Sequence, residues 1–123
     1  MVCLRRVWFG NIERLTEHNP YYRKVLFTNH EQLVLMSLKV GEDIGNEVHK
    51  GSDQFFRVEK GSVRFIVNNR QSFKVGAGDA VVIPSGTWHN VQNIGRIPAK
   101  LYTIYAPPTH KAGEIDKVKP KGD

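Results

Sequence analysis

Short runs of aliphatic, aromatic and β-branched residues, each followed by turn residues, recur along most of the chain, and no long helical periodicity is present. The clearest run lies between Ser62 and Val67, where apolar residues alternate with Arg64 before a tight turn at Asn68 and Asn69. Strands of this length and spacing, separated by turn signals, predict an all-β sandwich or barrel.

The remaining elements are predicted from the same signals. The segment QLVLMSLKV at residues 32–40 is apolar at nearly every position before Ser37, as expected of a strand covered on both faces. Residues 11–19 are compatible with a single helical turn or an irregular arm that ends before Pro20. The run AVVI at residues 80–83 predicts a short buried strand. Further strands are expected at residues 7–9, 21–28, 71–75 and 100–105.

The segment GNEVHKGSDQ contains three side chains that can bind a metal. Glu47 and His49 are two residues apart, so on an extended strand both side chains point to one face. The Gly-Ser-Asp sequence that follows is typical of a turn, and the next strand would return Gln54 to a place beside this pair. We therefore expect the three side chains to face a common point.

A second segment, GDAVVIPSGTWHNVQN, adds His89 after a short apolar run and a Pro-Ser-Gly turn. We expect its imidazole to complete a centre formed by Glu47, His49, Gln54 and His89. Trp88 precedes His89 and is therefore expected on the opposite face of an extended segment, packed in the core or at an interface.

The two segments together resemble the motifs of the cupin family. The first family motif has a glycine, five residues, a His-any-His pair, three or four residues, a glutamate, six residues and a glycine. The second has a glycine, five residues, a proline, any residue, a glycine, two residues, a histidine, three residues and an asparagine. The corresponding positions here are Gly41, Glu47, His49, Gln54 and Gly61 in the first motif, and Gly78, Pro84, Gly86, His89 and Asn93 in the second.

The resemblance implies one jelly-roll β-barrel at residues 29–105, with an arm and first strand at 1–28 and a tail at 106–123. It also implies one divalent transition metal, either zinc, iron, manganese or nickel, and a small-molecule substrate. Many small cupins are dimers, so a homodimer is compatible with the resemblance. Tyr21 and Tyr22 are then expected either at a contact between two copies or in edge packing within one chain.

Two positions depart from the family pattern. Glu47 stands where the family usually has its first histidine, and Gln54 stands where it usually has its glutamate. Gln54 offers only a neutral carbonyl oxygen and is the weakest of the four ligands. If it stays loose, Glu47, His49 and His89 have the composition of a two-histidine, one-carboxylate site, which suits non-haem iron and oxygen chemistry.

With Gln54 bound, the ligand types match the zinc site of the phosphomannose isomerases of the cupin superfamily, with Glu and Gln exchanged in order. This resemblance, and that to small mannose-6-phosphate-isomerase-like cupins, implies an isomerase acting on a sugar phosphate or a similar polar compound. The alternatives are an iron(II) or nickel(II) dioxygenase and a non-catalytic module that binds a sugar or another metabolite. The candidates for the base of an isomerase are Asp53, Glu59, Tyr102 and Tyr105.

The 123 residues, 40% of them hydrophobic, fit one domain. No apolar run approaches the length of a membrane span and no secretory signal is visible, so we expect a cytoplasmic protein without a membrane partner. Cys3 is the single cysteine and cannot form an intramolecular disulfide. The net charge of +6 is dispersed, which argues against a nucleic-acid partner and favours small anionic substrates.

Residues 106–123 break the strand pattern. Their Pro-Pro pair, glycines and lysines are typical of a solvated tail, in which only Ile115 and Val118 are available as apolar anchors. The alternative is a lid that closes on the mouth of the barrel, in which His110 would be the residue of interest.

Overall fold

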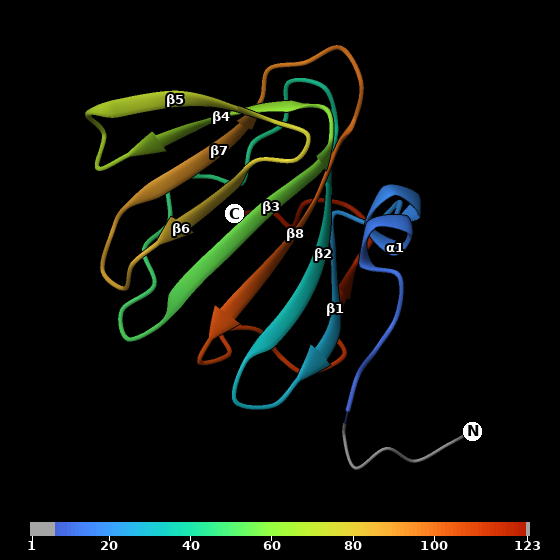
Figure 1. Cartoon of the computed structure of the whole chain (residues 1–123). Helices are drawn as coiled ribbons and strands as arrows, with labels where there is room; N and C mark the ends of the chain where they lie inside the picture. The colour runs from blue at the N-terminus through green and yellow to red at the C-terminus, as the bar shows by residue number, and fades with distance from the viewer. Residues whose placement is uncertain (1–6, 123) are drawn as a thin grey trace.

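The computed structural model describes residues 7–122, so Cys3 lies outside the described residues. The elements in this part of the chain are α1 (Ile12–His18), β1 (Arg23–Thr28), β2 (Gln32–Leu38), β3 (Asp53–Lys60), β4 (Ser62–Val67), β5 (Gln71–Gly76), β6 (Ala80–Ile83), β7 (His89–Asn93), β8 (Ala99–Ala106) and β9 (Ile115–Asp116). They form two antiparallel sheets, with strand orders β6-β3-β8-β2-β1-β9 and β5-β4-β7 (Figure 1). The predicted all-β class is therefore confirmed.

The core lies between the two sheets because their strands alternate inward apolar residues with outward ones. Phe56 of β3 and Phe65 of β4 meet edge to face across this core, with ring centroids 5.0 Å apart. Strand β2 is buried at every position except Leu33, which confirms the prediction of a strand covered on both faces. Tyr22 also packs in the core of this one chain. The rest of the core is Val25, Val34, Met36, Leu38, Ile44, Val58, Val63, Val75, Ile83, Val91, Ala99, Leu101 and Tyr105.

Two turns position β4 against the core. Gly61 joins β3 to β4 with a φ of +93°, a backbone conformation that glycine adopts freely. A Cβ atom at this position would lie only 3.1 Å from the Cα of Ala99, so the connection packs closely against β8. At the other end, Asn68 and Asn69 have φ angles of 52° and 56° and join β4 to β5 in the predicted tight turn.

The helix α1 is capped by Asn11, whose side chain accepts a hydrogen bond from the backbone N–H of Arg14 at 2.9 Å. Its end is tied to the large sheet by Lys100 of β8, whose Nζ donates to the backbone oxygen of Asn19 at 2.7 Å and to Ser37 Oγ at 2.9 Å. Burial lowers the pKa of this lysine. Within residues 7–122, no helix is long and apolar enough to cross a membrane.

Two of the strand predictions are wrong. Residues 7–9 form no strand, because the edge of the large sheet beside β1 is occupied by β9. Strand β6 is not buried as predicted, and Val82 is 63% exposed, because β6 is the opposite edge of that sheet. Trp88 is 45% exposed and does not pack in the core.

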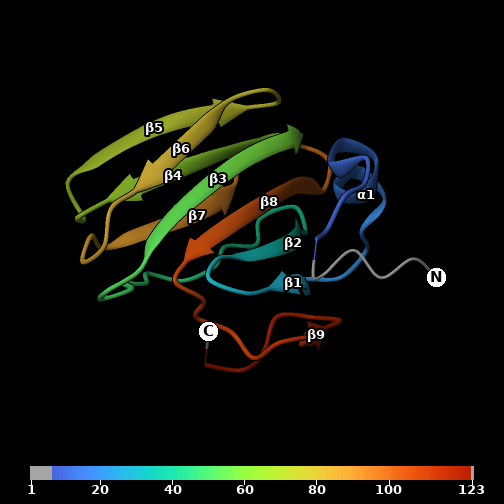
Figure 2. The same cartoon turned by 60° about the horizontal axis from the view of Figure 1, so that its bottom comes forward.

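The tail folds back along the large sheet and is attached to it (Figure 2). Strand β9 pairs with Arg23 and Lys24 of β1, and the Arg23 guanidinium donates to Asp116 at 2.8 Å. Ile115 and Val118 are 50% and 61% exposed, so the expectation that they anchor the tail is wrong. The anchors are polar groups, and the tail is not simply solvated.

Candidate metal centre

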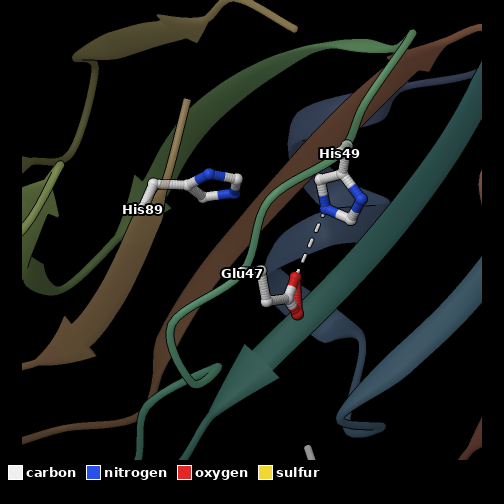
Figure 3. A group of neighbouring side chains, drawn as sticks. All are labelled: Glu47, His49 and His89. Atoms are coloured by element: carbon white, nitrogen blue, oxygen red, sulfur yellow. Dashed lines mark ion pairs between the residues drawn. The ribbon is translucent and has the colours of Figure 1, made fainter. Parts of the chain in front are cut away.

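Glu47, His49 and His89 approach one another from different parts of the chain (Figure 3). The segment that carries Glu47 and His49 is not the predicted strand, because Gly45 and Gly51 have positive φ angles and interrupt the extended backbone. Two isolated bridges to β7, Asp43 with Gln92 and Glu47 with His89, replace the strand. In the second bridge, the backbones of Glu47 and His89 exchange two hydrogen bonds of 2.8 Å, which fixes the two side chains relative to each other.

One ligand atom from each of these three residues lies within 4.8 Å of the other two. The Nε2 atom of His49 is buried, makes no hydrogen bond and lies 3.4 Å from Glu47 Oε1. A cation about 2.0–2.2 Å from each ligand atom would hold neighbouring ligand atoms roughly 3–3.5 Å apart. The buried imidazole nitrogen and the carboxylate therefore fit a divalent cation, which would supply the partner that His49 Nε2 lacks.

His89 is fully buried and directs its Nε2 atom to the same centre. Its Nδ1 atom lies 2.9 Å from the backbone oxygen of Thr87, which can only accept, so Nδ1 carries the proton. Burial lowers the pKa of His89, because the charged ring would lose its hydration. The ring is thus neutral near pH 7, with a lone pair on Nε2. Metal-binding histidines are commonly oriented by such a carbonyl.

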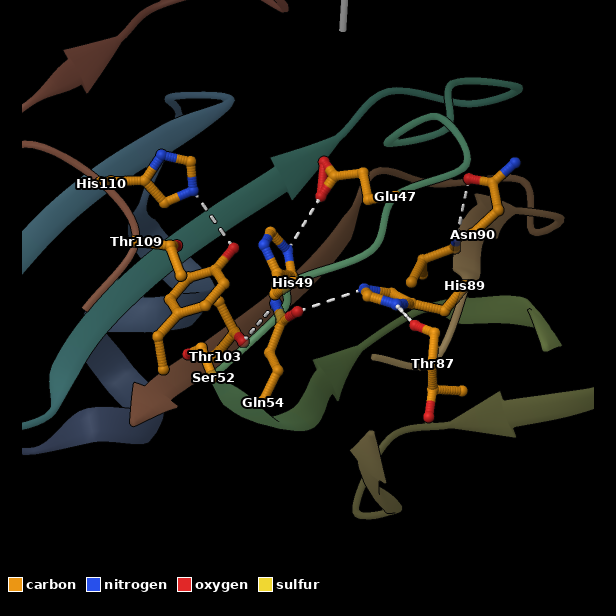
Figure 4. A network of polar contacts seen from close by, with 12 residues as sticks. Glu47, His49, Ser52, Gln54, Thr87, His89, Asn90, Thr103, Thr109 and His110 are labelled. Atoms are coloured by element: carbon orange, nitrogen blue, oxygen red, sulfur yellow. Dashed lines mark hydrogen bonds and ion pairs between the residues drawn. The ribbon is translucent and has the colours of Figure 1, made fainter. Parts of the chain in front are cut away.

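Gln54 adds an amide oxygen on the side of His89 (Figure 4). Its Nε2 donates to Thr103 Oγ1 at 2.9 Å, and its Oε1 lies 3.2 Å from His89 Nε2. Because the His89 proton is on Nδ1, both of these facing atoms are acceptors. Two acceptors at this separation match neighbouring ligands of one cation. The structure thus brings together all four residues singled out in the sequence.

Of the four residues considered as a base, only Tyr105 is part of the core beside this centre. Tyr102 lies three positions earlier on β8 and lines a cavity of about 390 Å³ on the outer side of the sheet, together with Trp8 and Leu33. Asp53 and Glu59 occupy positions of β3 that alternate with the inward Gln54. Asp53 instead accepts a hydrogen bond from the backbone of Ser85, and Glu59 pairs with Arg57.

Tyr105 connects the centre to the tail. Its ring stands edge-on to the ring of His49, with centroids 5.2 Å apart, and burial raises the pKa of its hydroxyl. His110 of the tail places its Nε2 atom 3.2 Å from this hydroxyl. Burial, reinforced by the nearby charge of Arg23, lowers the pKa of His110 to about 4. His110 Nδ1 lies 3.6 Å from Glu114 Oε2. Because the ring is uncharged at neutral pH, this contact is not an ion pair.

Sequence reasoning missed Thr103 and Thr87, which orient Gln54 and His89. Thr103 lies two residues before Tyr105 on β8, and therefore on the same inward face. A polar residue at a core position of a strand was an available signal. Thr87 acts through its backbone carbonyl, so its side chain carries no signal for this role.

Two facing antiparallel sheets with a cluster of metal-binding side chains between them define a jelly-roll barrel with an internal polar centre. The chain belongs to the cupin family, because residues 34–105 match the family model described as Cupin domain. The crystal structure of BH2720 from Bacillus halodurans has the same fold, with a TM-score of 0.91 and 45% identity, covering 93% of this chain and 91% of that chain.

Two relatives extend the similarity beyond the barrel. The protein YrkC of Bacillus subtilis, called uncharacterized, is 48% identical over 117 residues, which cover 89% of this chain. The match spans only 62% of the length of YrkC. The protein L612 of Acanthamoeba polyphaga mimivirus, also called uncharacterized, is 44% identical over 120 residues, covering 94% of this chain and 75% of L612.

Proposed function

We propose that this chain is a divalent-metal-dependent isomerase that acts on a small hydroxy-carbonyl compound, a sugar or a sugar phosphate, in the manner of mannose-6-phosphate-isomerase-like cupins. One observation carries the proposal. The group of metal-binding side chains lies beside Tyr105, whose hydroxyl is buried and protonated. Isomerisation of a hydroxy-carbonyl compound needs polarisation of an oxygen and movement of protons, and this centre has groups suited to both tasks.

The residues divide into those that hold a cation and those that meet the substrate. A bound divalent cation supplies Lewis acidity toward a carbonyl or hydroxyl oxygen. Glu47, His49 and His89 would hold it, with Gln54 as a neutral fourth ligand. His89 and Gln54 are 0% and 2% exposed, whereas the side chains of His49 and Glu47 are 17% and 25% exposed. Substrate therefore approaches from the side of His49 and Glu47, toward Tyr105.

Charge near the centre indicates how the substrate is held. Arg23 influences the pKa of both Tyr105 and His110, and its Nη1 atom lies 2.8 Å from Asp116 and 3.5 Å from Glu114. A phosphate would have to compete with these two carboxylates for the guanidinium. We infer that hydroxyl and carbonyl oxygens are held at the centre, and that a phosphate, where present, stays toward the basic surface.

Metal content is the first test of this proposal. Protein purified without chelator or affinity-column metal should contain about one atom of zinc or manganese per chain by elemental mass spectrometry.

Proton exchange is the second test. In D2O, the metal-loaded protein should exchange the α-proton of mannose, mannose 6-phosphate or fructose 6-phosphate in ¹H NMR spectra. Exchange should stop with chelator and in His89→Ala, but not in Gln71→Ala, a control on the exposed β5. A protein that takes up no metal, or no exchange with any probe, would rule the proposal out.

One observation favours a dioxygenase as the second candidate. Without the neutral Gln54 oxygen, the group that remains is two histidines and one carboxylate, the composition typical of non-haem iron sites. The same metal analysis separates the two functions. Iron as the bound metal, together with oxygen uptake that depends on a small organic substrate, would replace the isomerase proposal.

A further inference from the structure

Two of the candidate metal ligands, Glu47 and His49, lie on an irregular segment between β2 and β3 (Figure 3). Residues 43–52, which we call the ligand segment, are hydrogen-bonded on one side to β7 and to the turn before it. The N–H of Ile44 donates to a backbone oxygen of β7 at 3.1 Å, and the N–H of Gly86 donates to the His49 carbonyl oxygen at 3.0 Å. These contacts fix only one side of the segment.

The tail contacts both ends of the ligand segment. At the first end, Lys119 Nζ donates to Asp43 Oδ1 at 2.9 Å. At the second end, the hydroxyl of Ser52, a residue that is 5% exposed, donates to the Pro107 backbone oxygen at 2.6 Å. The start of the tail thus meets the end of the segment, and the end of the tail meets its start. The tail therefore brackets the segment that carries the two ligands.

Between these two contacts the tail is fixed to the barrel. Gln32 of β2 is 0% exposed, and its Oε1 accepts a hydrogen bond from the His110 N–H at 3.0 Å. Its Nε2 donates to the His110 carbonyl oxygen at 2.7 Å. Further along, the N–H of Val25 donates to the Glu114 backbone oxygen at 2.8 Å. Displacement of the tail would remove partners from a buried amide, which is unfavourable, so the tail is a firm support.

Asp43 joins the tail to the strand that carries the third candidate ligand. Its Oδ1 accepts from Lys119, and its Oδ2 accepts from Asn90 Nδ2 at 3.0 Å. Asn90 follows His89 directly on β7. The hydrogen bond from Lys119 is the main cause that lowers the pKa of Asp43, so the carboxylate is charged and the ion pair is present at neutral pH.

Glycines flank the two ligands of the segment. Gly45 and Gly51 have φ angles of 86° and 85°. Glycine loses more conformational freedom on becoming ordered than any other residue. Asp43 and Ser52, which contact the tail, lie just outside these two glycines. Their contacts restrict the segment before a cation binds, and preorganised groups bind with a smaller loss of entropy.

We propose that the tail is a strap that holds the ligand segment in its metal-binding form, with Lys119 as a positioning residue that acts through Asp43. This inference deepens the proposed function and rests on it, because the purpose of the strap is to place Glu47 and His49 for the cation. The tail is then a working part of the metal site although it contributes none of the four candidate ligands.

Hydrogen exchange of the metal-free protein, followed by NMR, tests the strap directly. In Lys119→Ala, the amides of Ile44 and Glu47, which donate to β7, should exchange about two- to fivefold faster, as expected on loss of a partly exposed ion pair. Lys119→Arg retains the charge and the donor and should restore the wild-type rate. Lys121→Ala removes the same charge at an exposed position two residues away and is the matched control.

Zinc binding tests the consequence for the site. In competition with a coloured chelator, Lys119→Ala should bind Zn²⁺ about two- to fivefold more weakly than the wild type, whereas Lys119→Arg and Lys121→Ala should not. The loss should largely disappear in an Asp43→Asn background, because the contact through which Lys119 acts is already weakened. Saturation with Zn²⁺ should in turn slow hydrogen exchange in residues 115–119 of the wild type, since coupling between two sites is reciprocal.

Two results would overturn the proposal. Equal exchange of Ile44 and Glu47 in Lys119→Ala and Lys121→Ala would show that the tail does not support the ligand segment. Faster exchange with unchanged Zn²⁺ affinity would show that Lys119 supports the segment without positioning its ligands. A wild-type protein that takes up no metal would remove the isomerase function, while the exchange rates would still decide whether the tail holds the segment.

Discussion

The amide oxygen of Gln54 lies 3.2 Å from Nε2 of His89, although the proton of that ring is on its other nitrogen, against the carbonyl of Thr87. The two facing atoms have no hydrogen to share, so the pair is unfavourable alone and favourable around a cation. Thr103 holds the amide in this orientation. This contact assigns the buried Gln54 side chain to the polar centre and not to the apolar core.

Gln54→Ala should weaken divalent-metal binding by roughly 10–100-fold, while His89→Ala should weaken it more, because a neutral amide is a poorer ligand than an imidazole. Competition with a coloured chelator measures both affinities. Gln71→Ala, on the exposed β5, should bind metal as the wild type does. Equal affinities in wild type and Gln54→Ala would show that the amide is not a ligand.

Thr103→Val should lower stability and metal affinity although it replaces none of the candidate ligands. The substitution preserves shape but removes the hydroxyl that accepts from Gln54 Nε2 at 2.9 Å, in a position that is 0% exposed. Leaving this buried amide donor unpaired should lower the free energy of unfolding by about 1–3 kcal/mol. Metal affinity should fall as well, because Gln54 is no longer oriented. Urea unfolding of the metal-free protein gives the first quantity, and unchanged stability would contradict the assignment.

The strands were predictable because their signals are local. Val63 and Phe65 alternate with Arg64, and the two asparagines that follow favour the tight turn that joins β4 to β5. The exposure of β6 was not predictable in this way. It depends on β6 lying at an edge of the large sheet, and the strand order is set by pairing between residues far apart in the sequence.

The candidate centre was located through the spacing of motif residues, although the expected strand around Glu47 is absent. One bridge to His89 gives the same convergence of side chains. The prediction for the tail was wrong about its anchors, because only its apolar residues were considered as anchors. Gln32 begins an apolar run, and nothing in that run indicates that its amide binds His110. Polar contacts between distant segments leave no periodic signal in the sequence.

In metal-free protein, His110 should make stability decrease as the pH is lowered. Its pKa is about 4 when folded, below the ordinary value of 6.5, so the unfolded chain binds more protons between these values. Its contribution is therefore fully present above about pH 6.5 and is lost as the pH falls toward 4. After allowance for solvent screening, the loss is about 1–2 kcal/mol.

Urea unfolding in the presence of chelator, repeated between pH 4.5 and 7, tests this expectation. The curve of stability against pH should be flatter for His110→Gln than for the wild type. His18→Gln serves as the control, because His18 is exposed on α1 and its ring nitrogen pairs with the backbone oxygen of Arg14 in the same helix. Parallel curves for His110→Gln and wild type would mean that the His110 pKa is not lowered by folding.

Asp116→Asn should release the tail while leaving the barrel folded. It weakens the 2.8 Å contact with Arg23, whose side chain is only 6% exposed, and a charged hydrogen bond of this kind contributes about 1.5–3 kcal/mol. Glu114 stays within 3.5 Å of the guanidinium, so the charge keeps one partner and the core does not open. Hydrogen exchange followed by mass spectrometry should become roughly tenfold faster or more in residues 107–118 and stay unchanged in β3 and β4.

The control for this prediction is Glu13→Gln, on the exposed first turn of α1, which should change hydrogen exchange in neither region. Acceleration in β3 as well as in the tail would show that the tail is an integral part of the folding unit, and not a segment that opens separately.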